Sequence, residues 1–108
     1  RKLLNSCANI TGGGIIDNIK RIIPSGLCAH IDLSKIKVKK IFRWIKNQNV
    51  NDLEMIKTFN CGVGFIVIIK KKNLNKIKKY FEKEYKPYVI GKIIKGKSKV
   101  LLDGKINW

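Results

Sequence analysis

The sequence predicts a mixed α/β (α+β) domain in which helices pack on a mixed sheet of four to five strands. Segments with apolar residues at helical spacing alternate with short runs rich in β-branched residues. The chain has 108 residues, 44% of them hydrophobic, which suits one domain with one core. We therefore expect residues 1–108 to form a single domain.

The first third of the chain predicts two helical segments and a strand. Residues 1–7 resemble the tail of a helix. After three glycines, isoleucines recur at helical spacing from Ile15 to Ile23, and Pro24 ends the pattern. Residues 27–31 alternate in the manner of a strand with one buried face.

Two further helices are predicted in the middle of the chain. The first has an apolar stripe at helical spacing, and Trp44 stands outside it. That stripe consists of Val38, Ile41, Phe42 and Ile45. The second helix, residues 51–59, begins with Asn51 and Glu54, a pair typical of a helix N-terminus.

The last part of the chain predicts three strands and a helix. Residues 62–69 form a continuous apolar run, which predicts a central strand covered on both faces. A helix is expected from Asn73, with Leu74, Ile77 and Phe81 facing inward. Residues 88–94 and 99–102 are predicted to form two strands of a hairpin.

The net charge of +17 suggests an anionic partner such as nucleic acid, because a positive surface gains from releasing the counterions of phosphates. Lys outnumbers Arg by 21 to 3, however, whereas specific recognition of phosphates and bases favours arginine. The chain also has 19 Ile and 10 Asn but only 2 Ala, a bias typical of an AT-rich coding sequence. We favour a solvated basic surface, and a stand-alone basic nucleic-acid-binding module remains the alternative.

The composition also indicates where the protein resides. No apolar run reaches the roughly 18 residues that span a bilayer, so no membrane segment is expected. Cys7, Cys28 and Cys61 are odd in number and widely spaced, without the paired spacing of metal or redox sites. These features predict a reduced, cytoplasmic protein.

A run of three glycines after Thr11 is the strongest chemical feature. Gly12, Gly13 and Gly14 let the backbone approach a ligand, and free N–H groups at a helix N-terminus favour phosphate. A tight turn from strand to helix explains the same residues equally well, because short glycine motifs often occur without a ligand. The residues alone leave both interpretations open.

Other candidate groups are sparse. Asn60 offers an amide beside Gly62 and Gly64, although a structural turn is the favoured interpretation of these residues alone. His30 is the only histidine, so neither a histidine pair for a metal nor a Ser-His-Asp triad is available, and we interpret it as structural. No paired carboxylates suit acid-base catalysis. The residues themselves indicate no catalytic group and no metal site.

Several segments resemble the AIR synthases, the phosphoribosylformylglycinamidine cyclo-ligases of purine biosynthesis, in family order and spacing. The matching positions are residues 9–14, 18, 19, 21 and 24, residues 41–45, residues 54–64 and residues 88–91. The stretch Thr58-Phe59-Asn60-Cys61-Gly62-Val63-Gly64 is similar to the family's Thr-Phe-Asn-x-Gly-x-Gly signature.

The resemblance implies that this chain is the C-terminal, substrate-side domain of a longer two-domain ligase, and the start at Arg1 rather than Met fits that interpretation. The family reaction is an ATP-dependent conversion of formylglycinamidine ribonucleotide to aminoimidazole ribonucleotide. ATP and Mg²⁺ would be held mainly by an N-terminal domain absent from this chain, and the isolated domain would be inactive. The implied partners are the ribonucleotide substrate, the N-terminal domain and a second copy in a full-length homodimer, with no specific nucleic acid and no membrane.

The resemblance also implies where ligands bind, namely in the groove between the two domains. The candidate substrate- or phosphate-binding residues are Asn9, Thr11, Gly12, Gly13, Gly14, Asn60 and Gly62. Catalytic residues remain unassigned. The family's usual histidine is replaced by Asn9, whose amide can form hydrogen bonds but cannot transfer a proton near neutral pH.

Overall fold

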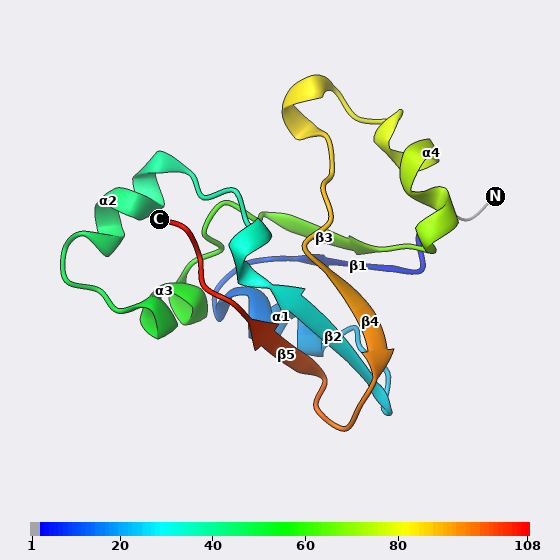
Figure 1. The fold of residues 1–108 in the computed structure, drawn as a ribbon, viewed down its shortest axis with the longest axis horizontal. Coiled ribbons are helices and arrows are strands. Elements are labelled where there is room, and N and C mark those ends of the chain that lie inside the picture. Colours follow the sequence, from blue (N-terminus) through cyan, green and yellow to red (C-terminus); the bar gives the residue numbers. More distant parts are fainter. Residues whose placement is uncertain (1–2) are drawn as a thin grey trace.

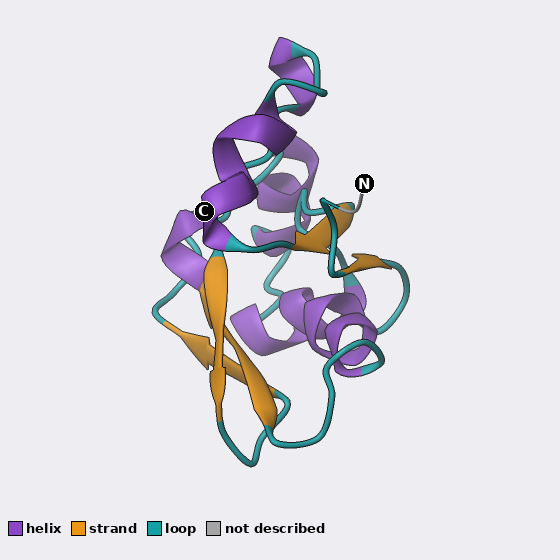
Figure 2. Cartoon of the chain, turned by 90° about the vertical axis from the view of Figure 1, so that its right-hand side faces the viewer, coloured by secondary structure: helices purple, strands orange, loops and turns teal. Residues whose placement is uncertain are grey.

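Residues 3–108 are described by the computed structural model, in which five strands form two sheets (Figure 1). The smaller sheet pairs β1 (Ser6–Asn9) with β3 (Phe65–Ile68) in antiparallel orientation. The larger sheet has the order β4-β2-β5, with β2 at Leu27–Asp32, β4 at Gly91–Lys95 and β5 at Val100–Asp103. The mixed helix-and-strand class is confirmed, but each sheet contains fewer strands than the single sheet predicted (Figure 2).

The hairpin predicted for the last two strands is wrong, because β2 lies between them. β2 is antiparallel to β4 and parallel to β5. Ala29 of β2 stands opposite Ile93 on one side and Val100 on the other. Ala29 and Ile31 are buried, as expected for the central strand of the sheet. Their apolar side chains can pack against residues of both β4 and β5.

The central strand predicted for residues 62–69 is also wrong. β3 has only four residues and pairs with β1 alone, and Phe65 at its start is 60% exposed. The first residues of the apolar run form a turn instead, with Gly62 at a φ of 102°. Apolar composition could not reveal that this turn shortens the strand.

The predicted helix tail at residues 1–7 is replaced by a strand where the structure describes it. Arg1 and Lys2 lie outside the described residues, while Ser6 and Cys7 belong to β1. Ser6 pairs with Ile68 and Cys7 with Val67, so β3 supplies the backbone hydrogen bonds that favour a strand here.

The core lies where α1 (Gly14–Lys20) meets α3 (Asp52–Thr58). Ile15 of α1 and Met55 of α3 have no exposed surface. Helix α1 ends three residues before the predicted limit of Ile23. The Oδ1 atom of Asn51 accepts the backbone N–H of Glu54 at 2.9 Å, which confirms the predicted start of α3.

Helix α2 (Lys40–Lys46) contains the predicted apolar stripe except Val38, which precedes it, and α4 (Leu74–Lys78) is shorter than predicted. Ile41 of the predicted apolar stripe is 58% exposed. Phe81 is 40% exposed rather than inward-facing, because α4 ends before it and helical spacing no longer applies. Within residues 3–108, none of the helices has the length and apolar character needed to cross a bilayer.

The segment after β5 returns to α2 and α3 (Figure 1). Ile106 is buried in the core. The indole N–H of Trp108 donates to Oδ1 of Asp52 in α3 at 3.1 Å, and Nε of Arg43 in α2 donates to the backbone oxygen of Trp108 at 2.5 Å. Residues 104–108, which we call the C-terminal strap, therefore join the two helices.

Candidate functional site

The ladder between β1 and β3 brings the two predicted ligand segments together. Asn9 at the end of β1 pairs with Phe65, and the N–H of Ile10 donates to the backbone oxygen of Gly64 at 2.9 Å. We call residues 11–14 the glycine loop and residues 60–64 the Asn60 turn. Although about 50 positions separate them in sequence, they lie at the same end of the β1-β3 ladder.

At two of the three glycines, neighbouring atoms leave no room for a side chain. Gly14 has a φ of 70°, and a Cβ atom there would lie 1.8 Å from the backbone oxygen of Ile56 in α3. Gly13 has a φ of 91°, and its Cβ would lie 2.7 Å from Oδ2 of Asp17. Gly12, by contrast, has no atom within 4 Å of such a position. Only Gly12 leaves its glycine identity without a structural explanation.

Asn18 fastens the glycine loop from within. Its side chain is buried, and its Nδ2 donates to the backbone oxygen of Gly14 at 2.7 Å. The same nitrogen lies 3.3 Å and 3.4 Å from the backbone oxygens of Thr11 and Gly12. Its Oδ1 accepts from the hydroxyl of Thr11 at 3.2 Å and from Nη1 of Arg21 at 3.3 Å. One amide thus contacts most of the loop.

In the sequence, Asn18 stands out only as part of the family pattern. A physical signal was nevertheless present, because Asn18 stands among the inward-facing positions of α1, beside Ile15 and Ile19. A polar residue at a core position requires hydrogen-bond partners, and the loop four residues earlier is the nearest source of them.

The Asn60 turn is held by its own side chain. Oδ1 of Asn60 accepts the N–H of Gly62 at 2.8 Å, and Cys61 has a φ of 55°. A Cβ at Gly62 would lie 3.0 Å from the backbone oxygen of Lys37. Burial raises the pKa of the Cys61 thiol to about 11, so this cysteine is protonated and unreactive near neutral pH.

The candidate residues differ in how far they reach the surface. Asn9, Thr11 and Gly12 are exposed. Gly13, Asn60 and Gly62 are half-buried, and Gly14 is buried against α3. The part of the site open to a ligand is therefore the end of β1 and the first half of the glycine loop.

The chain is similar to one known protein family and to a curated relative. Residues 1–104 match the family described as AIR synthase related protein, C-terminal domain. The chain belongs to this family. A curated relative, the trifunctional purine biosynthetic protein adenosine-3 of Chironomus tentans, is 44% identical over 92 residues. That match covers 84% of this chain but 7% of the relative, so the chain spans a small part of that protein.

The AIR synthase resemblance implies ATP and Mg²⁺, but the side chains that the structure describes in this domain do not fit a metal ion. Among residues 3–108, no group of three or more His, Cys, Asp or Glu side chains is placed to hold a metal ion. His30 pairs with Asp103, at 3.6 Å from Nε2 to Oδ2, on the three-stranded sheet. Asp17 is the acidic residue beside the glycine loop. We therefore derive no metal-dependent step for the residues of this AIR synthase related domain.

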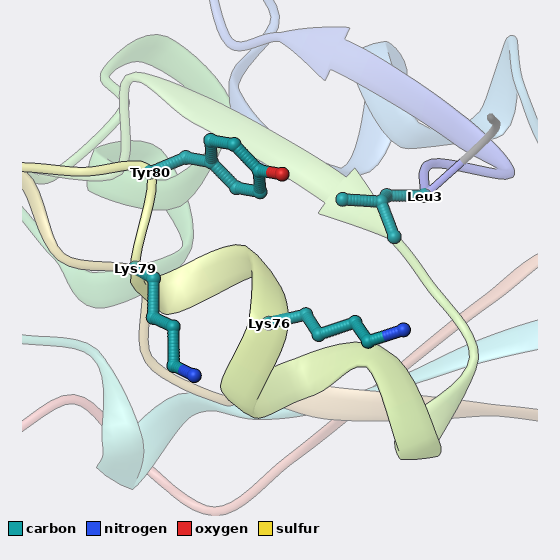
Figure 3. Close-up of a pocket in the computed structure, with 4 residues that line it drawn as sticks. All are labelled: Leu3, Lys76, Lys79 and Tyr80. Carbon is teal, nitrogen blue, oxygen red and sulfur yellow. The ribbon is translucent and has the colours of Figure 1, made fainter.

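A surface hollow lies at the opposite end of the β1-β3 ladder from the glycine loop. It is lined by Leu3, Lys76, Lys79 and Tyr80, from the segment before β1 and from α4 with the turn after it. Tyr80 and Lys76 extend toward Leu3, whereas Lys79 points away (Figure 3). Ser6 and Ile68 pair near this end, and Asn9 and Phe65 pair near the loop. The hollow is therefore separate from the candidate site.

Proposed function

We propose that this domain forms the substrate-side wall of an ATP-dependent cyclo-ligase, which converts formylglycinamidine ribonucleotide to aminoimidazole ribonucleotide in de novo purine biosynthesis. The observation that carries the proposal is the family match over residues 1–104. The name of the 44% identical relative, a purine biosynthetic protein, supports the same pathway.

In the proposed reaction, the amide oxygen of the substrate receives a phosphoryl group, and an internal nitrogen then displaces it to close the imidazole ring. ADP and phosphate are the other products. ATP supplies the phosphoryl group, and Mg²⁺ would neutralise charge on its phosphates. Both would be held mainly by an N-terminal domain, which would be part of the same full-length chain and of a homodimer.

The residues of this domain would bind and orient the substrate rather than transfer protons. Glycine leaves the backbone of Gly12 open on its outer side, where a phosphate could accept hydrogen bonds from N–H groups. The hydroxyl of Thr11 is already oriented by Asn18. Asn9 and the free Nδ2 side of Asn60 can offer neutral hydrogen bonds to the nucleotide.

The amide side chain of Asn9 limits what this residue can do in the proposed reaction. It lies at the end of β1 opposite Phe65, where an amide can bind substrate but cannot act as an acid or base near neutral pH. In the proposed enzyme, proton transfer would therefore come from a group other than Asn9.

Steady-state kinetics of the full-length enzyme test the proposal. Purified protein should form aminoimidazole ribonucleotide only when formylglycinamidine ribonucleotide, ATP and Mg²⁺ are all present. The matched control is the same chain lacking residues equivalent to this domain, which should not cyclise the substrate. A folded full-length protein without cyclisation activity would refute the assignment.

A further inference from the structure

Two adjoining hollows beside α4 are lined by lysines, and no acidic residue of the described chain lines either of them. The first is formed by Leu3, Lys76, Lys79 and Tyr80. The second shares Leu3 and Lys76 with it and adds Leu4, Asn5, Lys70, Lys72 and Asn73. Because of the shared residues, we treat the two hollows as one surface, formed by these nine residues, and call it the lysine hollow.

The four lysines of this surface lack a counterion in the described part of the chain. All four are exposed, and none of the ion pairs among residues 3–108 involves Lys70, Lys72, Lys76 or Lys79. The sequence has no Asp or Glu from residue 55 to residue 81. A group of positive charges without nearby carboxylates attracts a partner of opposite charge. The lysine hollow therefore favours an acidic ligand.

The lysine hollow also presents apolar surface. The side chain of Tyr80 is 77% exposed and extends toward Leu3 (Figure 3). Leu3 and Leu4 are half-buried, so part of each remains accessible. An exposed tyrosine beside accessible leucines is typical of a surface that packs against the apolar side chains of a protein partner. An occupant that matches the whole surface thus needs apolar groups as well as negative charge.

These residues favour a protein segment over a nucleic acid. No arginine lines the hollow, although arginine is the residue best suited to phosphates and bases. Single-stranded nucleic acids stack successive bases on aromatic rings, whereas this surface offers the single ring of Tyr80. The aliphatic side chains of Leu3 and Leu4 suit a leucine-like side chain instead.

We infer that the lysine hollow is a docking site for an acidic amphipathic segment of a partner protein. The carboxylates of that segment meet the four lysines, and its apolar side chains pack on Leu3, Leu4 and Tyr80. Charge complementarity is the main support for this choice of partner. The inference is independent of the proposed function, because the hollow lies at the opposite end of the β1-β3 ladder from the glycine loop.

Fluorescence anisotropy with a synthetic peptide tests the inference. The probe is a glutamate-rich peptide with leucines at helical spacing, titrated with the full-length protein at physiological salt. One control peptide has serine in place of each leucine, and another has glutamine in place of each glutamate. Only the first peptide should bind, because the surface combines charge with apolar groups. Equal binding of the serine peptide, or no binding of the first peptide, would overturn the inference.

Lysine variants locate the bound peptide on the protein. Changing all four lysines of the hollow to glutamine should weaken peptide binding by about tenfold or more, since each exposed ion pair contributes a little. The matched control removes the same charge from four exposed lysines outside the hollow, namely Lys57, Lys92, Lys95 and Lys97. Lys76→Gln, at a residue that lines both hollows, serves if the fourfold variant does not fold. Equal weakening in the hollow variant and the control would show general attraction and contradict a docking site.

A tyrosine variant tests the apolar part of the surface. Tyr80→Ala should weaken peptide binding by about fivefold, because exposed tyrosines contribute strongly to protein interfaces. Tyr85→Ala is the matched control, at a tyrosine that is 70% exposed and lines neither hollow, and it should leave the affinity unchanged. A single-stranded oligonucleotide is measured in the same way. If it binds more tightly than the peptide and this binding is lost with the four lysines, the hollow is a nucleic-acid site and the inference is wrong.

Discussion

Gly12 and Gly14 are two positions apart, but only Gly14 is required by the packing of the fold. Gly14 lies against the backbone of Ile56 with a φ of 70°, whereas the space around Gly12 is open. We expect Gly14→Ala to destabilise the protein by about 3 kcal/mol or to prevent folding, because backbone atoms cannot move aside cheaply. Gly12→Ala should leave the free energy of unfolding nearly unchanged. Urea denaturation of the two variants measures this difference.

Gly13 is a less suitable probe of ligand binding than its sequence position suggests. The sequence predicts that Gly13→Ala affects substrate binding more than folding. In the structure, the left-handed φ of 91° and the nearby Asp17 give this substitution a folding cost as well. Gly12→Ala is therefore the cleaner variant for measuring substrate affinity.

Asp17 places a negative charge beside the amides proposed to bind phosphate. Its Oδ2 lies 2.7 Å from the position of a Cβ on Gly13. Because like charges repel, Asp17→Asn should strengthen ribonucleotide binding by a few-fold, about 0.5 to 1 kcal/mol at low salt. Isothermal titration of the full-length enzyme measures the change. Weaker binding in the variant would show that the carboxylate contacts the ligand productively or that the phosphate lies elsewhere.

The three cysteines should differ sharply in reactivity. Cys7 is exposed, whereas Cys28 and Cys61 are buried. Native protein treated with iodoacetamide at pH 8 should therefore carry one modification, at Cys7, and mass spectrometry identifies the site. Rapid modification of Cys61 in the folded protein would contradict its burial.

The raised pKa of Cys61 also predicts a loss of stability in alkali. The folded thiol keeps its proton up to a pKa of about 11, while the unfolded thiol ionises near 9.0. Between these values the unfolded state binds fewer protons, so the free energy of unfolding falls as pH rises, by up to about 2 kcal/mol. Cys61→Ala should lose less stability between pH 8 and pH 11 than the parent, as measured by denaturation at each pH. Parallel pH profiles would contradict this account.

At the scale of elements, the C-terminal strap links α2 to α3. Helix α2 has no fully buried residue, so its position depends strongly on few contacts. Arg43→Met removes the guanidinium N–H of α2 that donates to the backbone oxygen of Trp108 and should cost about 1 kcal/mol of stability. It should also speed amide hydrogen exchange in α2 more than in α1. Unchanged exchange in α2 would show that the strap does not hold the helix.

Helices and strands were predicted well where the signal lay within a single short segment of sequence. The cap at Asn51 and the strand at β2 both follow from short stretches of sequence. Pairing between distant segments was harder, and so the hairpin of β4 and β5 was wrong. Nothing in residues 88–102 reveals that β2, some 60 positions earlier, lies between those strands.

The candidate site shows the same division. The glycine loop and the Asn60 turn were both recognisable from their residues, but their contact through Ile10 and Gly64 depends on the β1-β3 ladder. The role of Asn18 required knowing that its position in α1 is buried. Sequence patterns could identify the parts, whereas their assembly required tertiary structure.

At the scale of the whole molecule, the net charge of +17 should produce only weak attraction to nucleic acid. Charges on a solvated surface are screened beyond about 8 Å at physiological salt. We expect binding to a single-stranded oligonucleotide at low salt to be independent of sequence and to disappear at physiological salt. Fluorescence anisotropy at the two salt concentrations measures this. Persistent, sequence-selective binding would favour the alternative of a nucleic-acid-binding module.

Hydrogen exchange of the proposed full-length enzyme, with and without formylglycinamidine ribonucleotide, tests the proposed placement of the substrate most directly. Bound substrate should slow exchange in residues 9–14 and 60–64, since both segments meet at one end of the β1-β3 ladder. Exchange in α4, beside the separate hollow, should not change. Protection confined to α4, or no protection in residues 9–14 of a substrate-saturated enzyme, would contradict the account.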